Sequence, residues 1–267
     1  MAVDQPARCA NCDAPVPAMT IGPHCTVCGA RVTPTRLTFR GIAATSFEHV
    51  LSADPPLLRT LIDLFRFPGR VASDYLAGRR LKYASPLKFN LLTAAVTMAV
   101  INLVLARMPH APPVAGEATV STGRQLVQEA TVLSQSWQNH YLQVLYAASL
   151  PLLAWLLKLM PGRGSSRNAM DFYVMGLYSF GQIYLLQAAC GLTGYWLRDT
   201  PGAVVCGILA AALPFWFFPW MATGFCPGRP VRTALLSSVA LILFGLIVST
   251  VLLGAAAVWL AATHSNS

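Results

Sequence analysis

Residues 234–262 read ALLSSVALILFGLIVSTVLLGAAAVWLAA and contain no charged side chain. A helix needs about 20 mainly apolar residues to cross a hydrocarbon core about 30 Å thick, and this stretch exceeds that length. Over the whole chain, 55% of the residues are hydrophobic and 11% are charged, whereas an ordinary soluble domain has about 25% charged residues. The sequence therefore predicts a helical membrane protein.

Four other apolar stretches come before this one in the chain. They are Leu87–Ala106, Tyr141–Leu157, Phe172–Trp196 and Gly202–Phe225. Prolines occur inside the second and fourth stretches, where neighbouring helices can satisfy the carbonyl groups that a proline leaves free. We therefore expect a mainly α, polytopic fold with about five transmembrane helices in a membrane domain over residues 86–263.

The positions of the basic residues predict the orientation of the chain. Lys and Arg accumulate in cytoplasmic loops because they resist translocation. With the N-terminus inside, sixteen of the nineteen Lys and Arg residues fall on the cytoplasmic side, and only Arg107, Arg124 and Arg198 fall outside. We expect a multi-pass protein of the cell inner (plasma) membrane, with a cytoplasmic N-terminus and an outside C-terminus.

The N-terminal residues 1–36 carry two C-x2-C pairs separated by twelve residues, at Cys9, Cys12, Cys25 and Cys28. Two such pairs at this spacing are typical of a zinc ribbon, because each tight turn supplies two sulfur ligands to one tetrahedral Zn²⁺. Gly29 follows the second pair, where a turn with positive φ is expected. Four thiolates leave no open coordination position, so we expect a structural Zn²⁺. Two disulfides and an iron or redox site are the alternatives.

Between the ribbon and the membrane, residues 37–85 are too polar to span a bilayer. Apolar residues recur at helical spacing around Leu57–Phe65, which predicts a helix that Pro68-Gly69 ends and a second short helix beginning near Val71. Arg59 and Asp63, four residues apart, are expected to support the first helix as an ion pair. These amphipathic basic helices either lie in the headgroup region or form a small cytoplasmic subdomain. Candidate contacts to lipid headgroups or a partner are Arg66, Arg79, Arg80, Lys82 and Lys88.

The same segment carries a motif, Y-x-x-G-x-R-x-x-Y-x-x-P, that runs from Tyr75 to Pro86. Together with Arg59, Thr60, Leu64 and Pro68-Gly69 it resembles the characteristic block of an uncharacterised bacterial family of polytopic inner-membrane proteins. That family is a domain of unknown function with an N-terminal zinc ribbon. The resemblance covers about the first hundred residues. It implies the same architecture and no established activity.

One polar stripe is expected inside the membrane domain. Asp171, Tyr178 and Gln182 are spaced seven and four residues apart, which places them on one side of a helix. Such residues either line a path for a substrate or proton or form hydrogen bonds between helices. The histidines are scattered, and no phosphate-binding glycine loop or catalytic motif occurs.

These observations favour a non-enzymatic membrane protein whose zinc ribbon and basic helices dock a cytoplasmic protein or lipid headgroups. The alternatives are a transporter or lipid-handling protein that uses the polar stripe and a membrane-bound enzyme. The net charge of +9 is spread along the flanks of the apolar stretches, so we expect membrane lipid as a partner and no nucleic acid.

Overall fold

The computed structural model describes residues 8–15, 24–30, 55–107, 149–159, 167–226 and 230–265. The main helices are α2 (Pro55–Arg66), α3 (Pro68–Leu76), α4 (Pro86–Leu105), α6 (Ala169–Trp196), α7 (Gly202–Phe225) and α8 (Pro230–Ser265). A shorter apolar helix covers Ser149–Leu159. Within these ranges no β-strand occurs, and β-structure is limited to isolated bridge residues, among them the pair Arg8 and Pro15, so the mainly α prediction is confirmed. The first half of the expected stretch Tyr141–Leu157, and residues 37–54, lie outside the described residues.

Three of the helices are long and apolar enough to cross a membrane. They are Pro86–Val104, Gly202–Phe225 and Pro230–Ala256. Helix α6 has 28 residues but is not among these three. It carries acidic and amide side chains, and most of its first sixteen residues are buried. The expected five spans and their orientation therefore stay predictions, while a membrane protein is supported.

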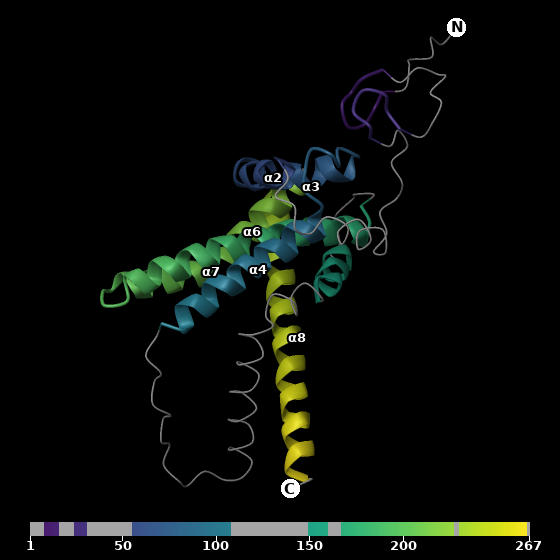
Figure 1. Ribbon diagram of the computed structural model, residues 1–267. Helices are drawn as coiled ribbons and strands as arrows, with labels where there is room; N and C mark the ends of the chain where they lie inside the picture. The colour runs from purple at the N-terminus through teal and green to yellow at the C-terminus, as the bar shows by residue number, and fades with distance from the viewer. Residues whose placement is uncertain are drawn as a thin grey trace.

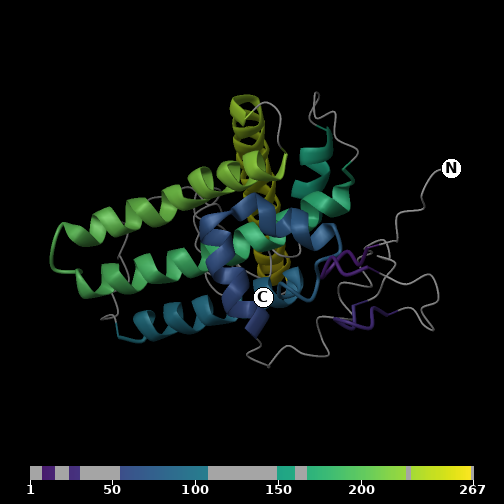
Figure 2. The ribbon, with the colours of Figure 1, turned by 90° about the horizontal axis from the view of Figure 1, so that it is seen from above.

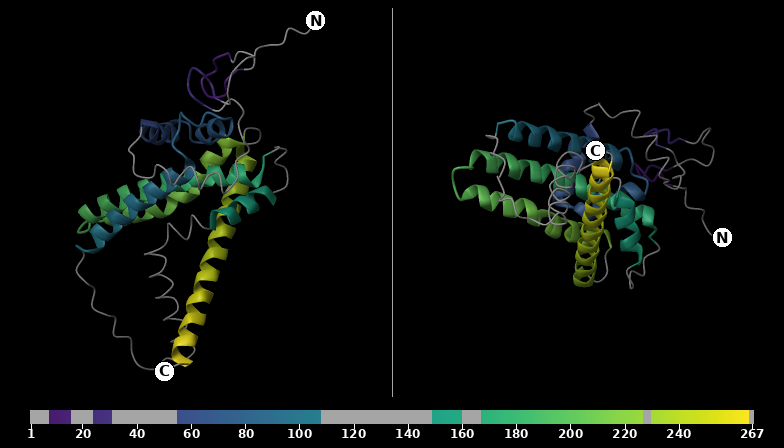
Figure 3. Two further views of the ribbon diagram at one scale, coloured as in Figure 1. Left: turned by 45° about the vertical axis from the view of Figure 1, so that its right-hand side comes forward. Right: turned by 90° about the horizontal axis from the view of Figure 1, so that it is seen from below.

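Helices α4, α6 and α7 lie side by side, with α6 between the other two (Figures 1 and 2). Helices α6 and α7 run antiparallel and are joined by a short turn. Helices α2 and α3 lie across one end of this layer, where α4 begins and α7 ends. Helix α8 packs on α7 near its start and then diverges from the layer (Figure 3). Helices α2 and α3 therefore cover this end of the layer.

Helix α3 begins at Pro68, three residues earlier than expected. A proline at the first helical position is favoured because its fixed φ suits the helix and its missing N–H has no partner to lose there. The Pro68-Gly69 pair therefore does end α2, as predicted, but it also starts the next helix. Gly69 has a second role, since a Cβ atom added to it would overlap the carbonyl carbon of Gly224. The backbones of α3 and α7 thus cross in direct contact.

Aromatic side chains fill the space beneath α3. The Tyr178 ring on α6 is fully buried and lies 6.0 Å from the Tyr75 ring and 5.9 Å from the Phe89 ring, measured between centroids. Its hydroxyl donates to the Ala84 carbonyl at 2.6 Å. A buried hydroxyl without a partner is costly, so this bond fixes α6 against the segment leading into α4.

One of the two prolines inside α7, Pro214, is accommodated by a neighbouring helix. Pro214 has no N–H to donate to the carbonyl of Ala210, four residues earlier. The Gln187 amide on α6 donates to that carbonyl instead, at 3.2 Å. The helix continues through both Pro214 and Pro219, as the sequence predicted.

Candidate functional site

The four cysteines of the ribbon converge in the structure. Their sulfur atoms all lie within 4.8 Å of one another, with Cys9 Sγ 3.7 Å from Cys28 Sγ and Cys12 Sγ 3.8 Å from Cys25 Sγ. A tetrahedral site with metal–sulfur bonds of about 2.3 Å separates its sulfurs by about 3.8 Å, whereas a disulfide needs about 2.05 Å. The donor set and its spacing fit a metal ion and do not fit two disulfides.

The two cysteine turns share one backbone pattern. In the first turn the Asp13 N–H donates to the Cys9 carbonyl at 2.9 Å, and in the second the Gly29 N–H donates to the Cys25 carbonyl at 2.8 Å. Asp13 and Gly29 both have positive φ, 61° and 71°. The expectation for Gly29 is confirmed. Asp13 occupies the equivalent place because Asp and Asn tolerate the left-handed region better than most residues.

Backbone amides point at these sulfurs and change their acidity. A hydrogen bond from the Ala30 amide is the main cause that lowers the pKa of Cys28 to about 7, and the Cys28 amide has the largest part in lowering the pKa of Cys25. For Cys12 the Ala14 amide also lowers the pKa, but burial and the three neighbouring thiols together raise it to about 12. Four thiolates so close together repel one another, and a bound cation would remove that repulsion.

One side chain of the first turn joins the ribbon to the rest of the molecule. Asn11, between Cys9 and Cys12, accepts a hydrogen bond from the Leu81 N–H at 3.3 Å. Leu81 lies in the loop between α3 and α4, which turns at Gly78 with a φ of 102°. Asn11 had no signal in the sequence beyond its position inside the C-x2-C pair.

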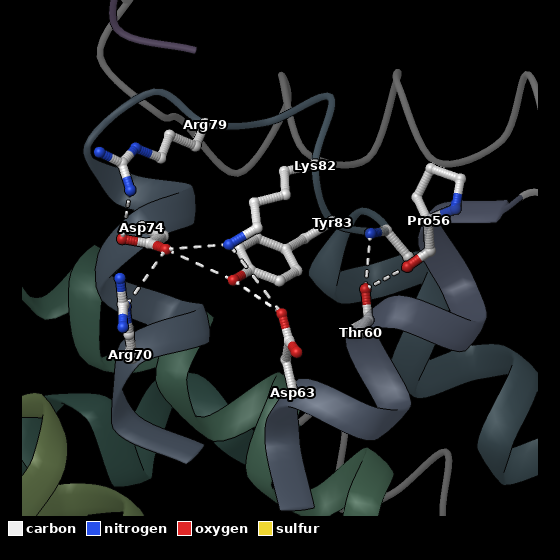
Figure 4. A network of polar contacts seen from close by, with 9 residues as sticks. Pro56, Thr60, Asp63, Arg70, Asp74, Arg79, Lys82 and Tyr83 are labelled. Carbon is white, nitrogen blue, oxygen red and sulfur yellow. Dashed lines mark hydrogen bonds and ion pairs between the residues drawn. The ribbon is translucent and has the colours of Figure 1, made fainter. Parts of the chain in front are cut away.

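The same loop carries a network of charged groups between α2 and α3, shown in Figure 4. The Asp74 carboxylate lies 3.4 Å from Arg79, 3.6 Å from Lys82 and 3.9 Å from Arg70. The Tyr83 hydroxyl lies 3.2 Å from Asp63 Oδ2 and 3.4 Å from Asp74 Oδ2, within donating distance of both. The Lys82 ammonium also lies 4.0 Å from Asp63. We call these six residues the shelf network: Asp63, Arg70, Asp74, Arg79, Lys82 and Tyr83.

Tyr83 is the centre of the shelf network. The residue is 3% exposed, and burial, followed by the charges of Asp63 and Asp74, raises its pKa above the usual value for tyrosine. The hydroxyl therefore keeps its proton and acts as a donor. Next to it, the buried Thr60 hydroxyl donates to the Pro56 carbonyl at 2.6 Å and accepts from the Ala84 N–H at 2.9 Å, which holds the loop against α2.

Comparison with known families locates this network in a recognised block. Residues 54–98 match a family model described as "Protein of unknown function (DUF3667)". No curated protein and no solved structure matches the chain. The DUF3667 region contains α2, α3, the loop and the first half of α4, and so includes every residue of the shelf network. The match supports the resemblance to a domain of unknown function and supplies no activity.

The basic residues singled out from the sequence occupy different surroundings. Arg79 and Lys82 are ion-paired in the shelf network, Arg66 is exposed, Arg80 is half-buried and Lys88 is 6% exposed. The expected pair between Arg59 and Asp63 is absent from the ion pairs of the described residues, because Asp63 turns to Lys82 and Tyr83. Asp74 and Arg70 were missed, since the sequence does not show which of the nearby cations an acidic residue will meet.

The predicted stripe on α6 separates into three different environments. Asp171 accepts the Asn168 N–H at 2.9 Å and caps the start of the helix, and Tyr178 is bonded to Ala84. Gln182 is fully buried, and neither its amide nitrogen nor its amide oxygen has a hydrogen-bond partner among the described residues. The first two therefore have structural roles, and Gln182 alone has an unused polar group.

Proposed function

We propose that this chain is a non-enzymatic membrane protein whose ribbon and DUF3667 region form one cytoplasmic docking surface, for a cytoplasmic protein or for lipid headgroups. The observation that carries the proposal is the hydrogen bond from the Leu81 N–H to Asn11. It joins a metal-binding turn to the loop that also holds the shelf network. A ribbon attached in this way lets one partner contact the ribbon and the DUF3667 region at the same time.

In this proposal the metal is a structural Zn²⁺. Four cysteine sulfurs would fill a tetrahedral shell, whereas catalytic zinc keeps an open position for water. The ribbon needs the ion because the core of its described residues, 8–15 and 24–30, is small: Cys9 and Cys25 are buried, with Cys28 and Ala30 packed against them. Structural zinc supplies about 10–16 kcal/mol to units of this kind.

The membrane part of the proposal is five spans in the inner membrane with the N-terminus inside. Three apolar helices of sufficient length support it, as does the bias of sixteen of nineteen basic residues. The arrangement agrees with this orientation, since α4 begins and α7 ends beside α3. The apolar stretch Tyr141–Leu157, whose second half lies in the short helix Ser149–Leu159, and α6 would supply the remaining two crossings.

The docking proposal is tested by crosslinking in intact cells. A photoreactive amino acid replaces Val27, which is 71% exposed on the second cysteine turn, and a matched control replaces Trp196, which is 77% exposed at the far end of α6. We expect a discrete adduct from position 27 that disappears when Cys12→Ser removes a metal ligand. An adduct that persists in the Cys12→Ser protein, or that forms equally from position 196, would contradict a metal-dependent docking surface.

A second function, transport or lipid handling through the membrane domain, is favoured by one observation. Gln182 is a buried amide without a partner among the described residues, and buried polar groups of this kind occur at functional sites as well as at bound waters. If this second function is right, a Gln182→Leu protein that is expressed normally should fail to rescue the phenotype of cells that lack the parent protein. Docking requires no such failure.

A further inference from the structure

We propose that a cavity beside the shelf network binds the phosphate group of an anionic phospholipid. This deepens the headgroup part of the proposed function and rests on it. The cavity measures about 260 Å³, and its wall is formed by Arg59, Asp63, Phe67, Arg70, Val71, Lys82 and Tyr83. Sites that enclose whole small ligands span about 300–1,000 Å³, so this cavity suits a headgroup fragment.

The charge on the cavity wall favours an anion. Arg59, Arg70 and Lys82 contribute three cationic groups to the wall, against the carboxylate of Asp63 on the wall and that of Asp74, which pairs with Arg70 and Lys82. One positive charge remains in excess. The Asp63 carboxylate already faces Lys82 and the Tyr83 hydroxyl. Arg59 is exposed and has no carboxylate partner among the described residues. A guanidinium group can bind two phosphate oxygens at once, and Arg59 is available to do so.

The surface next to the cavity identifies the anion as a lipid. One stripe of α2 exposes Leu58, Ile62 and Phe65, which are 64%, 42% and 47% exposed, and Phe67 on the cavity wall is 55% exposed. Arg59 and Arg66 border this stripe. A helix that exposes apolar side chains beside a basic edge is suited to the boundary between headgroups and acyl chains. A soluble phosphate compound would have no use for the apolar stripe.

The position of the cavity agrees with that depth. Helix α3 touches the backbone of α7 through Gly69 and Gly224, one residue before α7 ends. The loop that carries Lys82 leads directly into α4, which begins at Pro86. Both α4 and α7 are long and apolar enough to cross a membrane. The cavity therefore lies at the ends of two such helices, where lipid phosphates are found.

The test measures lipid retained by the purified full-length protein. Native mass spectrometry counts phosphatidic acid and phosphatidylcholine molecules that remain bound after transfer from nanodiscs containing both. Arg59→Gln and Arg70→Gln remove charge from the cavity wall. Arg107→Gln is the control, because it removes the same charge from an exposed residue just beyond the opposite end of α4, away from the wall. Arg59→Lys keeps the charge, and circular dichroism with gel filtration confirms that each variant is folded.

We expect Arg59→Gln to lower retention of phosphatidic acid about fivefold, which corresponds to about 1 kcal/mol for one cation near anionic lipid. The double variant should lose more, and Arg59→Lys should retain most of the binding. Retention of phosphatidic acid by Arg107→Gln, and retention of phosphatidylcholine by every variant, should be unchanged. Equal losses of phosphatidic acid from Arg59→Gln and Arg107→Gln would overturn the proposal, because general surface charge would then explain the binding.

A second arm separates lipid from free phosphate. Inorganic phosphate at millimolar concentration is added to the delipidated protein, and binding is followed by ³¹P NMR. Weak binding that does not depend on Arg59 supports the lipid assignment, whereas binding of inorganic phosphate that Arg59→Gln abolishes would overturn it. Cys12→Ser should leave lipid retention unchanged. A failure of the metal-dependent docking surface is thus distinguishable from a failure of the cavity.

Discussion

The ribbon and the DUF3667 region lie next to each other in the chain but depend on different interactions. The ribbon has four convergent sulfurs, and its described residues bury little apolar surface besides two of the cysteines. The DUF3667 region has fully buried side chains such as Leu64 and Val71, an aromatic contact from Tyr75 to the membrane domain, and a network of ion pairs. In the proposed function the ribbon therefore depends on a bound metal ion, whereas the DUF3667 region depends on packing and ion pairs. Unfolding of either region should therefore leave the other region folded.

The largest expected effect is loss of the metal. Cys12→Ser or a strong chelator should unfold the ribbon, removing about 10 kcal/mol or more of its stability, while the thermal unfolding of the helices stays the same. Plasma mass spectrometry measures the loss of metal, and limited proteolysis of the N-terminal residues measures the unfolding of the ribbon. Unfolding of the helices together with the ribbon would contradict the independence of the two regions.

The same site should depend on pH in a defined direction. Protons compete with the metal for the thiolates, and the amides lower the pKa of Cys28 to about 7. Metal affinity should therefore fall as the pH decreases through and below neutrality and rise as the pH increases. A colorimetric chelator that reports metal release between pH 5 and 8 checks this, and release that is greater at pH 8 than at pH 5 would contradict it.

The next largest effect concerns the packing of α3 on α7. Gly69→Ala places a methyl group within the backbone of Gly224, so the helices must separate at a cost of about 3 kcal/mol. Gly245→Ala is the control, because nothing lies within 4 Å of the added atom. The midpoint temperature of thermal unfolding in detergent should fall for Gly69→Ala and not for Gly245→Ala. The metal content should not change in either.

A smaller effect is expected from the centre of the shelf network. Tyr83→Phe removes the hydroxyl shared by Asp63 and Asp74 while keeping the ring, at a cost of about 1 kcal/mol. Asp74→Asn should cost more, about 2 kcal/mol, because it leaves Arg79 and Lys82 without their nearest carboxylate. Chemical denaturation compares the two, and an Asp74→Asn protein as stable as the parent would show that the network contributes nothing.

The smallest effect should come from Gln182→Leu. Its amide has no partner among the described residues, so an apolar side chain of similar size should be neutral or stabilising by less than about 1 kcal/mol. Thermal unfolding measures this. A clear loss of stability would show that Gln182 binds a group such as an ordered water.

The ribbon was predictable because its geometry is local. The C-x2-C spacing fixes which atoms can meet, and the turn at Gly29 follows from its flexibility. The apolar stretches were predictable for the same reason, and the helices α7 and α4 match them closely. Helix α6 was assigned to the right residues, but its hydropathy alone does not distinguish a span from a helix packed between two others.

The shelf network was not predictable because its members come from α2, α3 and the loop after them. The spacing of Arg59 and Asp63 suggested a pair on one helix, and the tertiary fold instead brought Lys82 and Tyr83 to Asp63. Asn11 is a similar case, since its partner Leu81 is seventy residues away. Local spacing cannot report contacts that form only when separate elements pack together.

The central claim, that the ribbon is fixed to the DUF3667 region, is tested most directly by hydrogen exchange at the Leu81 amide. The full-length, metal-loaded protein in detergent is compared with Asn11→Ala, using overlapping peptides that isolate this position. We expect slow exchange at Leu81 in the parent and fast exchange in Asn11→Ala, with the metal retained in both. Equally fast exchange in the two proteins would contradict it.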